Sequence, residues 1–240
     1  MASPYFKKLV HDKRQANQPL RLDVEESQTP LEIVLRLTYP IPDPVIMDLD
    51  DLTDTYCVAV KYELPAATQA LRRMLSLPRF MERDPLRVYA IAVRFGLDDE
   101  AEHAAKLACK LPVRDWPACE EFDHIPASRY HDLFLYHKRR GTEAGELLTA
   151  TKFYRCKPAL CDGEWLKAYK SRAVGRLAEV PADDHVFTLQ YIYESCTATS
   201  RVHICTGCLD NVGNLLKIQA VLDTAKGLVY STQLKVKQGK

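Results

Sequence analysis

The chain has 240 residues, of which 47% are hydrophobic and 27% are charged, with 33 Lys and Arg residues against 32 Asp and Glu residues. This length allows one large or two small domains with a substantial buried core. The balanced charge produces no overall field that favours nucleic acid or an anionic membrane surface, so we expect neither as a partner.

No targeting or membrane segment stands out. No apolar run approaches the roughly 18 residues of a membrane-spanning helix, and the opening MASPYFKKLV lacks the apolar core of a signal peptide. The eight cysteines are then expected to be reduced thiols. The predicted location is the cytoplasm, the nucleus or both.

The first element predicted is a short strand. Residues 7–19 are polar without a period and predict a loop, whereas Leu20, Leu22 and Val24 alternate with polar neighbours. Strand is expected only in about the first 30 residues or in isolated short pieces, because helical periodicity dominates the rest.

Three short amphipathic helices follow, joined by proline-rich corners. In the first, Thr29 is expected to be the N-cap and Glu32 to complete a capping box. Asp48 is expected to begin the second, and Pro65 the third. The predicted inward residues are Leu31, Val34 and Leu35; Leu49, Leu52, Tyr56, Ala59 and Val60; and Ala67, Leu71 and Met74.

An αα-hairpin is predicted next. Asp84 precedes its first helix and Gly96 is expected to close that helix in the left-handed conformation. Asp98 begins the second helix, whose small inward residues permit close approach to a neighbour. These are Ala101, Ala104, Ala105 and Ala108. Residues 111–125 contain two prolines and predict irregular structure.

The remaining helices are predicted at about 126–149, 163–178, 183–195 and 209–222. Gly141 and Gly145 interrupt the first of these and are expected to weaken it by about 1 kcal/mol each relative to alanine. The last displays Val212, Leu215, Leu216 and Ala220. Across the chain, the core is expected to include Leu35, Leu52, Tyr56, Leu71, Val93 and Phe134.

Several spaced blocks resemble the second half of a BTB/POZ domain, most closely the BTB-containing families of mushroom-forming fungi. The blocks are YPIPDP (39–44), VKYELPAATQALRRML (60–75), SLPRF (76–80) and DPLRVYAIAVRFGLDDEAEHAA (84–105). The similarity covers roughly residues 2–150. The opening MASPYF resembles the end of a helix well inside that domain, so the leading strands and first helix are expected to be missing.

The resemblance implies a mainly α fold, with a truncated α+β BTB/POZ-like core followed by a helical region. The predicted domains are 1–77 (partial BTB/POZ-like), 78–150 (helical extension) and, after a loop at 150–163, 163–240 (C-terminal, helical and cysteine-containing). The resemblance also implies a non-enzymatic protein–protein interaction role, as adaptor or scaffold. The implied partners are a second BTB-containing chain or a cullin-type ubiquitin ligase scaffold.

The resemblance also bears on self-association. BTB dimers generally rely on the leading strand and first helix that this chain is expected to lack. We therefore expect a poor homodimer with apolar surface near residues 1–35. The strand at Leu20–Val24 would then be a docking edge for a second chain.

The alternative function is a zinc-stabilised C-terminal binding module. Cys205-Thr-Gly-Cys208 has the spacing of a zinc-binding turn, and His203 lies two residues earlier. Cys156 and Cys161 are the only plausible second pair for a four-cysteine site. The competing and favoured interpretation is that all four are ordinary, partly buried thiols, in which case the protein has no cofactor.

No pattern of an enzyme is found. His131 and His137 are six residues apart on one predicted helix and do not share a face. The acidic residues from Asp48 to Asp54 are better explained by the dipole of the helix that they begin. The cluster Arg72, Arg73 and Arg79 has no interleaved aromatic residues and indicates a solvated face.

Overall fold

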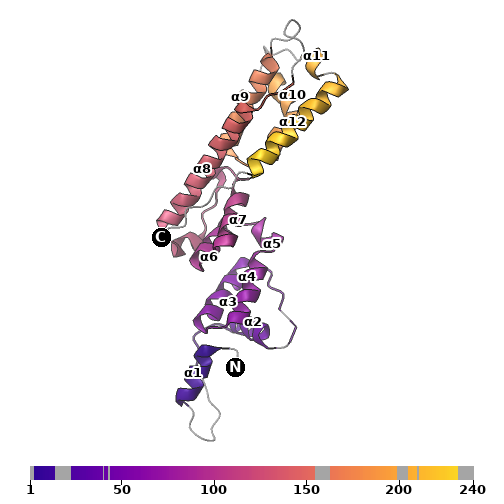
Figure 1. The fold of residues 1–240 in the computed structure, drawn as a ribbon. Coiled ribbons are helices and arrows are strands. Elements are labelled where there is room, and N and C mark those ends of the chain that lie inside the picture. Colours follow the sequence, from indigo (N-terminus) through magenta and orange to yellow (C-terminus); the bar gives the residue numbers. More distant parts are fainter. Residues whose placement is uncertain are drawn as a thin grey trace. The chain divides into compact units, whose positions relative to one another are not determined.

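The computed structural model describes residues 3–13, 23–39, 41–42, 44–154, 163–198, 205–209 and 211–231. Within these residues the chain is mainly helical and contains no strand, which confirms the mainly helical prediction (Figure 1). Of the predicted strand Leu20–Val24, only Asp23 and Val24 are described, and neither is in a strand. None of the described helices is long and apolar enough to cross a bilayer.

The contacts divide the chain into two compact units, Met1–Ile91 and Ala92–Lys240. We call them unit 1 and unit 2 and describe each by itself. The division into 1–77, 78–150 and 163–240 stays a prediction. Unit 1 contains α1 (Pro4–Lys13), α2 (Gln28–Thr38), α3 (Leu49–Lys61), α4 (Pro65–Leu75), α5 (Pro78–Met81) and most of α6 (Pro85–Arg94).

Helices α2, α3 and α4 pack against one another in unit 1. The side chain of Asp48 accepts a hydrogen bond from the Asp51 N–H at 2.8 Å, so Asp48 is the predicted N-cap of α3. Leu52, Tyr56 and Leu71 are buried, as predicted. Their burial confirms these three predictions, whereas Met74, also predicted to face inward on α4, is only half-buried.

Two predictions for α2 are wrong. The helix begins at Gln28, so Thr29 lies within it and the capping box does not form; Ser27 is the N-cap but makes no side-chain capping bond. The buried residues are Pro30, Ile33 and Val34, whereas Leu35 is 49% exposed. The side of α2 that faces the core therefore contains Ile33 and Val34 and not Leu35.

The N-terminal helix α1 contacts the rest of unit 1 at Tyr62. The Ser3 hydroxyl donates to the Tyr62 carbonyl at 2.6 Å, and the rings of Phe6 and Tyr62 stack with centroids 5.0 Å apart. Glu26 accepts hydrogen bonds from the Lys61 ammonium and the Tyr62 hydroxyl. These two bonds lower the pKa of Glu26 from its usual 4.5 to about 2.

Unit 2 contains the rest of α6 and nine further helical elements among its described residues. These are α7 (Asp98–Ala108), the 3-10 helices η1 (Val113–Asp115), η2 (Glu120–His124) and η4 (Asp184–Phe187), and the helices α8 (Ala127–Ala150), α9 (Glu164–Glu179), α10 (Leu189–Thr197), α11 (Thr206–Leu209) and α12 (Val212–Ser231). Gly96 has φ +68°, as predicted for the end of α6. The four inward alanines of α7 are buried.

The largest packing contact of unit 2 joins α8 and α9, which lie side by side in Figure 1. A Cβ atom added at Gly141 would lie 2.6 Å from the Leu177 carbonyl oxygen, and one at Gly145 would lie 3.2 Å from a methyl group of Val174. The two glycines therefore permit the close approach of α9. Their cost to the isolated helix is offset by this contact.

The predicted inner face of α12 is wrong. Val212 and Leu216 are 70% and 66% exposed, Ala220 is exposed and Leu215 is half-buried. The buried residues are Ile218, Leu222, Ala225 and Val229. Apolar residues occur on several sides of this helix, so its sequence pattern alone does not select a face.

Three further core predictions are wrong. Val60, on α3, is 50% exposed. Val93 and Phe134 were both expected in the core, but each is only half-buried. On α8 the buried positions are instead on the side of Leu133, Tyr136 and His137.

Candidate interaction surface

The clearest candidate site in unit 1 is the connection between α2 and α3. Proline-rich sequence ends α2, because a proline lacks an N–H and restricts the residue before it. The Tyr39 N–H still bonds the Leu35 carbonyl at 2.9 Å, and a guanidinium nitrogen of Arg36 lies 3.5 Å from the Pro42 carbonyl. The segment after Tyr39 is therefore held near the end of α2.

Residues 44–47 alternate between the core and solvent. Pro44 and Ile46 are buried, with Ile46 only 1% exposed, whereas Val45 is 75% exposed and Met47 is 69% exposed. A period of two residues is that of an extended chain with one face on the core. This segment therefore presents two apolar side chains on its outer face.

The backbone of this segment is open to a partner. No hydrogen bond involves the backbone N–H or C=O groups of Val45, Ile46 or Met47 within the described part of the chain. Unpaired groups on an extended segment can form a ladder with an added strand. The segment thus combines apolar contact with unused backbone donors and acceptors.

Three more apolar side chains adjoin this segment in sequence: Leu35, Tyr39 and Ile41, which are all exposed. We call these five residues, including Val45 and Met47, the 35–47 surface, because they are exposed, apolar and close in sequence. A group of exposed apolar residues is more typical of a binding site than a single one.

Carboxylates lie at the end of the 35–47 surface, in the first turn of α3. Burial and the nearby charges of Asp48, Asp54 and Asp50 raise the pKa of Asp51. Asp50 is paired with Arg87, whose guanidinium lies 2.5 Å away. These acids mark one end of the surface as negatively charged.

The structure describes two of the four cysteines of the zinc hypothesis. Cys205 precedes α11, and its carbonyl accepts a hydrogen bond from the Cys208 N–H at 3.0 Å. Cys208 is buried in the core of unit 2, and the half-buried Cys205 packs against that core. Cys156, Cys161 and His203 lie outside the described residues. The four-cysteine site therefore stays a prediction.

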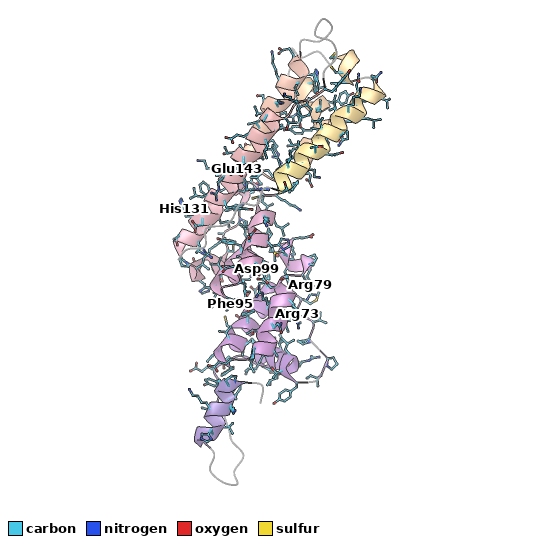
Figure 2. All side chains as sticks on the ribbon, in the orientation of Figure 1. Arg73, Arg79, Phe95, Asp99, His131 and Glu143 are labelled. Carbon is cyan, nitrogen blue, oxygen red and sulfur yellow. The ribbon has the colours of Figure 1, made fainter. Side chains whose placement is uncertain are left out.

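The two histidines considered from the sequence belong to unit 2, and the arginines belong to unit 1. His131 is exposed, whereas His137 is buried and one of its ring nitrogens lies 2.9 Å from the Leu111 carbonyl oxygen. Burial lowers the pKa of His137. Arg73 and Arg79 are exposed on unit 1 (Figure 2). Among the residues that the structure describes, no three His, Cys, Asp or Glu side chains form a metal-binding group.

Sequence reasoning missed Val45 and Met47 as surface residues. The available signal was the four-residue apolar run Pro44-Val-Ile-Met47, which lies between Asp43 and the N-cap Asp48. Four residues are too few for a reliable alternation pattern when all of them are apolar. Burial in the folded chain was needed to separate the two faces.

The comparisons with protein-family models, curated proteins and solved structures give no match to this chain.

Proposed function

We propose that this chain is a non-enzymatic protein–protein interaction protein, an adaptor or scaffold, that binds its partner through the 35–47 surface. The observation that carries the proposal is the segment 44–47, in which Val45 and Met47 are exposed and the backbone of residues 45–47 makes no hydrogen bond to another described residue. Strand addition supplies affinity through backbone hydrogen bonds and specificity through alternate side chains.

The resemblance to BTB/POZ domains supports the same proposal of a protein–protein interaction function. The block YPIPDP, one of those that carry the resemblance, lies within the 35–47 surface. The truncated α+β BTB/POZ-like core is part of this proposal, as are its expected partners, a second BTB-containing chain or a cullin-type ligase scaffold. The proposed location is the cytoplasm or the nucleus.

The experiment compares partner sets by proximity labelling in cells. The test variant carries Val45→Lys and Met47→Lys, which place two charges on the outer face of the segment. The control is Val60→Lys, since Val60 is an exposed apolar residue of the same unit. We expect partners that are retained by the parent and the control to be lost from the test variant. An unchanged partner set would contradict the proposal.

A second variant separates backbone pairing from apolar contact. Val45→Pro removes one N–H, and its fixed φ suits an extended segment. The change should weaken binding of a partner identified above, measured with purified proteins, if that partner adds a strand. Normal binding by Val45→Pro, with loss of binding by the charged variant, would restrict the mode to side-chain contact.

Sedimentation of the same purified variants tests a second copy as the partner. We expect the parent to be a poor homodimer. A tight homodimer that the charged variant dissociates would identify a second copy as the occupant of the 35–47 surface.

A further inference from the structure

Two cysteines lie close together at the start of α11 in unit 2. The Cys205 carbonyl accepts hydrogen bonds from the Cys208 N–H at 3.0 Å and from the Leu209 N–H at 2.9 Å, so these residues form one helical turn. Residues three positions apart on such a turn lie on the same side of it. Their burial agrees with this, because Cys208 belongs to the core cluster of unit 2 and Cys205 packs against the same cluster.

The spacing of the two cysteines suits a disulfide. Residues three apart on a helical turn have Cβ atoms about 5–6 Å apart, whereas a disulfide needs about 3.5–4.5 Å. Cys205 precedes α11, so a small change in its own backbone and rotamer closes that gap without unwinding the helix. Both residues are thiols in the structure, and the disulfide would be a second state of the same turn.

Hydrogen bonds to two neighbouring helices hold α11 in place. The Tyr193 hydroxyl, on α10, donates to the Leu209 carbonyl, and the side-chain amide of Asn214, on α12, donates to the Gly207 carbonyl at 2.8 Å. Figure 1 shows α11 next to the start of α12. Because neither bond involves a sulfur atom, the turn keeps both of them when the disulfide forms.

The two thiols differ in their access to solvent. Cys205 is half-buried, whereas Cys208 is 0% exposed, so a dissolved reagent meets Cys205 first. An accessible thiol beside a second thiol that can displace the reagent is the arrangement of a redox-sensing pair.

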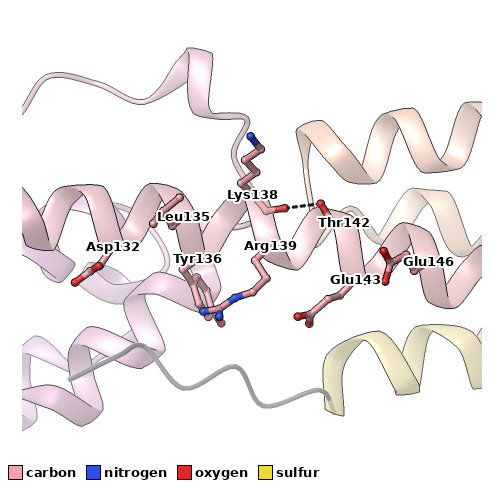
Figure 3. Close-up of a pocket in the computed structure, with 8 residues that line it drawn as sticks. All are labelled: Asp132, Leu135, Tyr136, Lys138, Arg139, Thr142, Glu143 and Glu146. Atoms are coloured by element: carbon pink, nitrogen blue, oxygen red, sulfur yellow. Dashed lines mark hydrogen bonds between the residues drawn. The ribbon is translucent and has the colours of Figure 1, made fainter. Parts of the chain in front are cut away.

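Two other cysteines of unit 2 are more deeply buried than Cys205. Cys109 is 2% exposed and lies beside Tyr136, a buried residue of α8 that Figure 3 labels. Cys196 is 1% exposed and belongs to the same core cluster as Cys208. Burial raises the pKa of the Cys109 thiol to about 12 and also raises the pKa of the Cys196 thiol, which lowers the amount of reactive thiolate. We therefore expect neither to react first.

We propose that Cys205 and Cys208 form a reversible redox pair, with Cys205 as the attacking thiol and Cys208 as the resolving thiol. The co-reactant is a small-molecule disulfide. The pair needs neither Cys156 nor Cys161, and it is independent of the 35–47 surface and of the function proposed for it.

The reaction consists of two thiol–disulfide exchanges. The Cys205 thiolate attacks one sulfur of the small disulfide, whose S–S bond breaks, and the departing thiolate takes up the proton that Cys205 lost. Cys208 then attacks the Cys205 sulfur, and the second small thiol leaves with the proton of Cys208. Two electrons pass from the protein to the reagent, so one S–S bond forms in the protein and two small thiols are released.

Equilibration of the full chain with mixtures of glutathione and glutathione disulfide tests the proposal. After acid quenching, alkylation and trypsin digestion, both cysteines are in one peptide, because Arg201 and Lys217 are the cleavage sites on either side. We expect this peptide to change from doubly alkylated to internally bonded as the share of disulfide rises, and to revert in excess glutathione. A peptide without an internal bond at every mixture, or bonds from either cysteine to Cys156, Cys161 or Cys196, would overturn the proposal.

Variants separate the two roles. Cys208→Ala should accumulate several-fold more of the glutathione adduct of Cys205 than the parent, because no thiol resolves it. Cys205→Ser should leave Cys208 unmodified, because Cys208 is buried. Cys57→Ser is the matched control: Cys57 is half-buried on α3 and is the single cysteine of unit 1, so the redox equilibrium of the pair should not change. Rapid glutathione uptake by Cys208 in Cys205→Ser, or absence of the adduct in Cys208→Ala, would overturn the assigned roles.

Native mass spectrometry of the untreated protein separates the redox pair from the zinc hypothesis. We expect the pair to oxidise reversibly in a protein whose mass contains no zinc. A bound zinc ion, with oxidation only after chelation, would overturn the redox pair and support the zinc-stabilised module.

Discussion

Helices α3 and α12 are both rich in apolar residues, but only in the first are most of the residues predicted to face inward buried. In α3, acidic residues cluster at the start and one apolar stripe remains, which contains Leu52 and Tyr56. In α12, Leu222 is buried and Leu216, six residues earlier, is exposed. Periodicity selects a face only when the opposite side is polar; otherwise the packing partners of the helix select it.

The largest expected effect is in the core of α3. Leu52→Ala should lower the free energy of unfolding by about 2–5 kcal/mol, through lost burial and the cavity that remains. Val60→Ala on the same helix should change it by less than about 0.5 kcal/mol, because Val60 is half-exposed. Urea denaturation measures both. Equal effects would show that the face of α3 is assigned wrongly.

The same test on α12 examines the side on which sequence and structure differ. Leu222→Ala should cost about 2–5 kcal/mol, whereas Leu216→Ala should cost less than about 0.5 kcal/mol. Guanidinium denaturation of the two variants decides between the faces. A larger loss for Leu216→Ala would restore the face predicted from the sequence.

The α8–α9 contact is expected to give an intermediate effect. Gly141→Ala places a Cβ atom 2.6 Å from a backbone oxygen, so overpacking of about 1–3 kcal/mol should exceed the gain in helix propensity of about 1 kcal/mol. Gly175→Ala is the matched control: it lies within α9 with no atom within 4 Å of the added Cβ. That change should stabilise the protein by up to about 1 kcal/mol.

Thermal unfolding measures these two glycine variants together. Opposite signs would support the close packing of α8 and α9. Stabilisation by both substitutions would mean that α9 does not approach Gly141.

Helix capping in unit 1 is expected to give a smaller effect. Asp48→Ala removes the bond to the Asp51 N–H and should cost about 1 kcal/mol. Ser27→Ala is the matched control, because Ser27 is also an N-cap but makes no side-chain bond there. The difference in denaturation midpoint between the variants measures the capping bond. A Ser27→Ala loss equal to that of Asp48→Ala would contradict its role.

The smallest effect is expected from Glu26, whose partner Lys61 is half-exposed. Its folded pKa of about 2 lies below its usual value of 4.5, so its charged form stabilises the folded state. This contribution is fully present above about pH 5 and is lost as the pH falls towards 2. The stability of the parent should therefore approach that of Glu26→Gln as the pH is lowered through this range.

Urea denaturation over a pH series measures that convergence. The control is Glu25→Gln, whose side chain is 96% exposed, and it should leave the stability near that of the parent throughout. A constant gap between the parent and Glu26→Gln from pH 6 to 2 would contradict the pairing of Glu26 with Lys61 and Tyr62.

The predicted helices of the chain follow from local features of its sequence. Asp48, Pro65 and Gly96 mark helix boundaries because capping and restricted φ angles act within a few residues. The same local signals placed α8 and α9 to within one or two residues. For α2 they failed, since Thr29 is a good N-cap residue but the chain is already helical at Gln28.

The candidate interaction surface depended on the folded chain. Val45 and Ile46 are both β-branched and apolar, and only packing of Ile46 on the core leaves Val45 outside. Similarly, the sequence predicts that Gly141 weakens its helix. Its role in the close approach of α9 depends on Leu177, which lies 36 residues further along the chain. Contacts between distant residues are set by the whole tertiary structure, not by local preference.

The sequence by itself determined that this protein is mainly helical and where many of its helices begin and end, because caps, prolines and periodicity act over one or two turns. Only the tertiary structure decided which side of α12 is buried, that two glycines permit the α8–α9 contact, and that Val45 and Met47 face outwards. Each of these depends on which surfaces meet when the chain compacts, since burial is a property of neighbouring elements rather than of a single segment.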